Sequence, residues 1–66
     1  MDPNDLHDRL LTINEVSEMT RLAVGTLYRL VSEKRIPVVH LSRRCLRFRL
    51  SDLNRWIESM AEFPEN

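Results

Sequence analysis

Apolar residues recur at helical spacing near the start of the chain. In the segment LLTINEVSEMT, Thr12 can cap a helix and Glu15, three residues later, can reach back to the Thr12 N–H, as in a capping box. The pattern therefore predicts a helix of about two turns that ends near residue 20. Three apolar residues share one side of this helix and form its expected core face: Ile13, Val16 and Met19.

A second helical pattern follows almost at once, in RLAVGTLYRLVSEKR. Leu22 is placed to pack in the turn between the two helices. One stripe of the second helix is apolar except at its end, and the opposite stripe is polar or small. The first stripe consists of Leu27, Leu30, Val31 and Lys34, and the second of Gly25, Tyr28, Arg29 and Ser32. Two short helices joined by so short a turn indicate a helix-turn-helix.

Gly25 lies inside this second helix, where a glycine costs roughly 0.5–1 kcal/mol relative to alanine. Its presence suggests that something approaches the helix backbone closely there. The alternative is that Gly25 lies in a frayed first turn and has no such role.

Two β-strands are predicted from Pro37 onward, and this proline disfavours helix at the preceding Ile36 and is expected to end the helical region. The strands are PVVHL, residues 37–41, and CLRFRL, residues 45–50. The connecting SRR contains no glycine, so we expect a loose loop and not a tight hairpin. The expected inward residues are Val39, Leu41, Leu46, Phe48 and Leu50, and the outward ones are Val38, His40, Arg47 and Arg49.

The segment SDLNRWIESMAEF predicts a third helix, capped by Ser51, with Asp52 at its positive end and Pro64 beyond its end. Its apolar stripe is Leu53, Trp56, Ile57 and Met60. The predicted fold class is α+β, in the order helix, helix, β-hairpin, helix. Residues 10–62 form the domain, between a flexible acidic tail at residues 1–9 and a short tail at residues 63–66.

The charges are segregated along the chain, although its net charge is zero. Residues 21–50 hold eight basic residues and one acidic residue, whereas residues 1–20 hold one arginine against five carboxylates. Residues 51–66 hold one arginine against four carboxylates. The basic block could neutralise the acidic ends within the fold, but it exceeds what such pairing needs. We therefore expect a polyanionic partner.

A chain of 66 residues forms one small domain and rarely encloses a catalytic cavity. No nucleophile–base pair, paired carboxylates or phosphate-binding loop is apparent, so we expect a binding module and not an enzyme. His40 and Cys45 could meet across the hairpin, but a structural zinc site needs four ligands. We expect no metal, no cofactor and no small-molecule substrate.

The chain also contains no apolar run of the ~18–20 residues that span a bilayer, and MDPNDLHD is unlike a secretion signal. Cys45 is the only cysteine, which fits a reducing compartment. We therefore expect a cytoplasmic protein without a membrane partner.

The segments LLTINEVSEM, GTLYRLVSEKRIPVVHL and RFRLSDLNRWIE together resemble the excisionase-type, MerR-like winged helix-turn-helix family of small bacterial and phage DNA-binding proteins. The resemblance covers roughly residues 10–60. It implies a winged helix-turn-helix fold and a protein associated with the nucleoid when bound to double-stranded DNA.

The resemblance also implies site residues. The second helix would be the recognition helix in the major groove, with Arg29 on a base edge and Thr26 on a phosphate or a thymine methyl. Tyr28 is equally consistent with packing and with a phosphate contact. The outward residues of this helix are Val24, Gly25, Thr26, Tyr28, Arg29 and Ser32. The hairpin would be the wing, with Arg43 and Arg44 at its tip and Arg47 and Arg49 on its exposed face.

Three positions depart from the family pattern. Arg21 stands where the turn between the helices usually has a glycine, and it could add a phosphate contact. Ala23 stands where a serine usually begins the recognition helix, so a side-chain cap is missing. SRR replaces the usual glycines of the wing tip.

Three functions fit these features. The first is a recombination directionality factor of a prophage or mobile element, which would bend DNA at attachment-site repeats and assist an integrase or bind with further copies of itself. The second is a small transcriptional regulator on the same scaffold. The third is a protein-interaction module that does not bind DNA.

Overall fold

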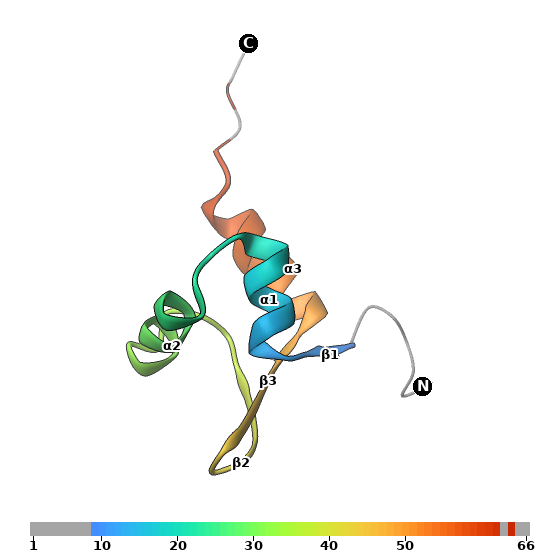
Figure 1. Cartoon of the computed structure of the whole chain (residues 1–66). Coiled ribbons are helices and arrows are strands. Elements are labelled where there is room, and N and C mark those ends of the chain that lie inside the picture. The colour runs from blue at the N-terminus through green and yellow to red at the C-terminus, as the bar shows by residue number, and fades with distance from the viewer. Residues whose placement is uncertain (1–8, 63, 65–66) are drawn as a thin grey trace, which may run out of the picture.

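The computed structural model describes residues 9–62 and residue 64. Residues 1–8, 63 and 65–66, which make up most of the two expected tails, lie outside the described residues. The elements are β1 (Leu10–Leu11), α1 (Ile13–Thr20), α2 (Val24–Ser32), β2 (Val39–Ser42), β3 (Cys45–Arg49) and α3 (Leu50–Met60). The predicted α+β class and winged helix-turn-helix order are therefore confirmed, and the β2–β3 hairpin projects away from the helices (Figure 1).

Helix α1 begins with the predicted capping box. The Glu15 N–H donates to the Thr12 hydroxyl at 3.2 Å, and the Thr12 N–H donates to the Glu15 carboxylate at 2.8 Å. The helix ends at Arg21, whose backbone is left-handed with φ 65°. Val16 is fully buried, but Met19 is 46% exposed. The prediction of Met19 as a core residue was wrong, because it lies in the last turn of the helix and is left largely uncovered.

Helix α2 ends at Ser32, before it reaches Pro37. The Arg35 N–H donates to the Leu30 carbonyl at 2.9 Å and the Lys34 N–H to the Val31 carbonyl at 3.1 Å, which is the bonding of a Schellman motif. Lys34 takes the left-handed conformation there, with φ 57°. The expectation that Pro37 ends the helix, and that Lys34 belongs to its apolar stripe, was therefore wrong.

The strands form one antiparallel sheet in the order β1–β3–β2. Strand β1 was not predicted, since two residues carry too little alternation to signal a strand. Val39 lies opposite Arg47, so these two residues share a face. Val38 packs against the core, whereas Leu41 is 55% exposed. The facing predicted for Val38, Val39 and Leu41 was wrong, because the pairing register sets it and not the local pattern, whereas His40 is exposed as expected.

The hairpin turn is tight, which corrects the prediction of a loose loop. Ser42 pairs with Cys45, so only Arg43 and Arg44 form the turn. Neither residue has a positive φ, although the two-residue turns that best match strand twist require one. A register shift between His40 and Ser42 places an extra residue in β2, and such a bulge changes the local twist.

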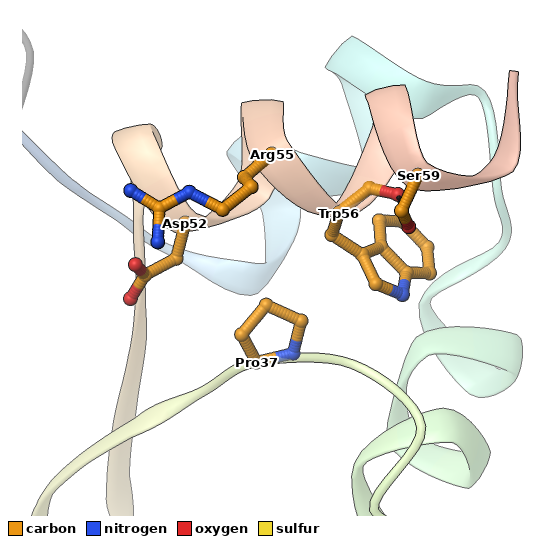
Figure 2. Close-up of a pocket in the computed structure, with 5 residues that line it drawn as sticks. All are labelled: Pro37, Asp52, Arg55, Trp56 and Ser59. Carbon is orange, nitrogen blue, oxygen red and sulfur yellow. Dashed lines mark hydrogen bonds between the residues drawn. The ribbon is translucent and has the colours of Figure 1, made fainter.

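The core lies between the sheet and the helices. It consists of Leu11, Val16, Leu27, Ile36, Phe48 and Leu53. Helix α3 is also joined to the loop after α2, because the Trp56 indole N–H donates to the Arg35 carbonyl at 2.9 Å. Figure 2 shows Trp56 facing the loop that carries Pro37, beside a shallow hollow of about 280 Å³.

Helix α3 begins at Leu50, and Arg49 at its start forms no side-chain cap, so the expectation that Ser51 caps this helix was wrong. The predicted apolar stripe of α3 is buried only in part. Leu53 is fully buried and Trp56 packs against the core, but Ile57 is 37% and Met60 55% exposed. None of the helices in the described residues has the length and apolar character needed to cross a membrane.

Candidate nucleic-acid interface

A groove of about 420 Å³ lies where the β2–β3 hairpin meets α1 and α2. The start of α1 contributes one wall, Tyr28 of α2 contributes to another, and the hairpin contributes the rest. The lining residues are Thr12, Ile13, Asn14, Tyr28, His40, Arg43, Arg44, Leu46 and Arg47. The groove therefore joins parts of the chain that are more than thirty residues apart in sequence.

Three arginines line this groove, and none of them forms an ion pair with a carboxylate of the described residues. Arg43 and Arg44 form the exposed turn. The Arg47 guanidinium donates to the Leu46 carbonyl at 2.8 Å, a bond that leaves its charge uncompensated. Like charges this close repel one another unless a negative group lies between them, so the groove is suited to an anion.

Arg49 is placed differently from the other hairpin arginines. Its guanidinium pairs with the Asp52 carboxylate of α3 at 3.2 Å, and it does not line the groove. The outward alternation of Arg47 and Arg49 in the sequence had suggested equal roles. The structure divides the four predicted wing residues into three unpaired arginines at the groove and one that is paired beside α3.

The exposed side of α2 carries most of the residues expected to recognise DNA. Gly25, Tyr28, Arg29 and Ser32 are exposed, and Val24 and Thr26 are half-buried. The Ser32 hydroxyl donates to the Arg29 carbonyl at 2.8 Å, so it is occupied by its own helix. Tyr28 is 52% exposed, so it lies at the surface and not in the core.

The turn before α2 has the exposed arginine and the missing side-chain cap that were predicted. Arg21 is exposed, and Ala23 begins α2 without a side-chain hydrogen bond to the helix. The left-handed φ of 65° at Arg21 explains why a glycine suits this position, because a glycine reaches that conformation without steric cost. The side chain of Arg21 is thus available at the surface beside the start of α2.

Asn14 and His40 are among the groove residues that were not predicted as DNA contacts. Asn14 is an exposed polar residue in the first turn of α1, which is common in any helix, and His40 had been considered only as a metal ligand. No sequence signal singled them out, since the groove is created by packing between α1 and the hairpin. Among the described residues, no three histidine, cysteine or acidic side chains gather into a metal site.

The chemistry of the groove is that of hydrogen-bond donors and positive charge. Guanidinium groups, a phenol and a side-chain amide are the groups that commonly contact phosphate oxygens in protein–DNA complexes. Acidic groups are absent from the lining, although Glu15 lies close by in the chain. Its pKa is lowered, first by the hydrogen bond from the Thr12 backbone and also by the ion pair with Arg9.

Comparison with known proteins gives one result. The family model of a helix-turn-helix domain matches residues 10–61, which include all six elements. No curated protein and no solved structure matches the chain.

Proposed function

Because the chain belongs to the helix-turn-helix domain family and is thereby a DNA-binding domain, we propose that α2 enters the major groove while the β2–β3 hairpin lies on the adjacent backbone as a wing. The observation that carries this proposal is the groove, where Arg43, Arg44 and Arg47 lie unpaired next to Tyr28. A phosphate backbone passing between the wing and α2 supplies the negative charge that these arginines lack.

The contacts divide into positioning and recognition. Arg29, exposed on α2, contacts a base edge and pairs best with guanine, while Thr26 contacts a phosphate or a thymine methyl. Tyr28 and the three groove arginines hold the backbone, and Arg21 adds a phosphate contact at the start of α2. Gly25, Val24 and Ser32 complete the surface that faces the duplex.

The biological role we propose is that of an excisionase-type factor, which bends DNA at repeated sites and so helps an integrase to assemble. The resemblance to that family supports it, as does the basic groove between the hairpin and α2. A factor of this kind acts by shaping DNA, for which a wing and a recognition helix are sufficient.

The salt dependence of binding tests the proposed contacts. Four arginines are assigned to phosphates (Arg21, Arg43, Arg44 and Arg47), so log K for duplex DNA should fall with log[salt] at a slope of roughly −4. Replacing Arg47 by alanine should make that slope shallower by about 1. Arg49→Ala is the matched control, because Arg49 is paired with Asp52 and should change the slope less. Equal slopes for the Arg47 variant and the unsubstituted protein would refute the wing assignment.

A gel-shift series tests the biological role. The DNA that flanks its own gene is footprinted, and the protected site is then placed at different positions within fragments of equal length. Bending makes the mobility of the complex depend on that position. A mobility that does not depend on it would refute the excisionase role and favour a regulator on the same scaffold, while a lack of affinity for duplex DNA at low salt would refute both.

A further inference from the structure

Gly25 is the second residue of α2, and the fold provides no reason for a glycine at this position. A fold requires glycine where φ is positive or where another part of the chain comes too close for a side chain. The φ of Gly25 is not positive. A Cβ atom built on it would meet no heavy atom within 4 Å. The helix therefore bears the loss of stability that glycine causes, with no compensation inside the described chain.

The position of Gly25 on the helix shows where that compensation can come from. It lies one turn before Tyr28 and Arg29, on the exposed stripe of α2. Tyr28 lines the groove that also contains Arg43, Arg44 and Arg47. Gly25 does not line the groove itself, and a duplex in the groove reaches it by extending along the exposed stripe toward the start of α2.

We propose that double-stranded DNA lies in direct van der Waals contact with the backbone of α2 at Gly25, leaving no room for a Cβ atom. This inference rests on the proposed function and adds to it a steric determinant of affinity. Arg29 and Tyr28 can then reach the DNA from a helix that lies deeper than one with a side chain at position 25 would allow. The glycine thus lowers the stability of the free protein and allows the DNA to lie closer to α2 in the complex.

Substitution of Gly25 separates its effect on the stability of the free protein from its effect on DNA affinity, because the two effects have opposite signs. Gly25→Ala should raise the thermal midpoint of the free protein, since alanine favours the helix and finds open space. The same variant should bind the footprinted duplex at least about tenfold more weakly, a loss that corresponds to about 1.4 kcal/mol. Gly25→Leu, another good helix former, should bind more weakly still.

The matched control is Asn54→Ala, an exposed position in α3, which should stabilise the protein without changing its affinity. Replacing each thymine of the site by uracil identifies the contacting group. A smaller loss for Gly25→Ala on uracil DNA indicates a thymine methyl, and an equal loss indicates the sugar–phosphate backbone; both support the close approach.

Two results would overturn the inference. If the alanine and leucine variants bind the duplex as tightly as the unsubstituted protein, the contact at Gly25 does not exist, although the proposed function stands. If the unsubstituted protein has no affinity for duplex DNA, the proposed function fails and this inference fails with it.

Discussion

Arg21 is an arginine in a conformation that favours glycine, and this allows a sharp prediction. Its φ is 65° and its ψ 20° at the end of α1. A side chain in this left-handed region costs about 1–2 kcal/mol, from the contact between Cβ and the following carbonyl. The Arg21 side chain is exposed and forms no ion pair with the described residues, so its removal sacrifices no such contact. Arg21→Gly should therefore stabilise the fold.

The magnitude follows from two opposing effects. Relief of the left-handed backbone contributes about 1–2 kcal/mol, while the added freedom of glycine in the unfolded chain removes about 0.4–1 kcal/mol. The Arg21 N–H donates to the Ser17 carbonyl at 2.8 Å, and that bond is kept because it belongs to the backbone. The net gain in the free energy of unfolding is about 0.5–1 kcal/mol. For a domain of this size, that raises Tm by about 2–8 °C.

Thermal unfolding followed by circular dichroism at 222 nm would measure this gain, and two further variants separate its causes. Arg21→Ala removes the same charge but keeps a Cβ, so its Tm should not rise. Lys34→Gly relieves the other left-handed residue, with φ 57°, and should give a similar gain. A Tm of Arg21→Gly no higher than that of Arg21→Ala would refute the reasoning.

Two further predictions concern local contacts. The hydrogen bond from the Thr12 N–H lowers the pKa of Glu15 below its ordinary value of 4.5. This carboxylate therefore stabilises the fold above pH 4.5, and its contribution is lost as the pH falls through the lowered pKa. Glu15→Gln should weaken the acid dependence of the urea midpoint, and an unchanged pH profile would show that the charge of Glu15 does not contribute to that dependence. Trp56→Phe removes the indole N–H that donates to the Arg35 carbonyl at 2.9 Å. It should lower the free energy of unfolding in urea by about 0.5–1.5 kcal/mol. An unchanged midpoint would show that this bond contributes nothing.

The helices and their order could be predicted from the sequence because their signals are local. The Thr12–Glu15 capping box spans three residues, and it forms as the spacing indicates. The departures at Arg21 and Ala23 were expected from the family resemblance, and the structure has a left-handed backbone at Arg21 and no side-chain cap at Ala23. The basic character of residues 21–50 could also be read directly, since charge is a property of composition.

The hairpin was predicted in outline but not in detail. Val38 and Val39 are adjacent and equally apolar, so the local pattern could not decide which one faces the core. That choice depends on the pairing of Val39 with Arg47 and on the register shift before Ser42. Both are set by contacts across the sheet, and a shift of one residue moves every side chain of a strand to the opposite face.

The candidate site shows the same division. The sequence identified the basic residues, but it treated Arg47 and Arg49 alike, and only the tertiary structure pairs Arg49 with Asp52 while leaving Arg47 at the groove. It also brings Asn14 to that groove from α1. Residue type and the capped start of α1 depend on neighbours a few positions apart, and the sequence determines them by itself. Which charges remain unpaired depends on distances between segments far apart in the chain, and these exist only once the core has formed.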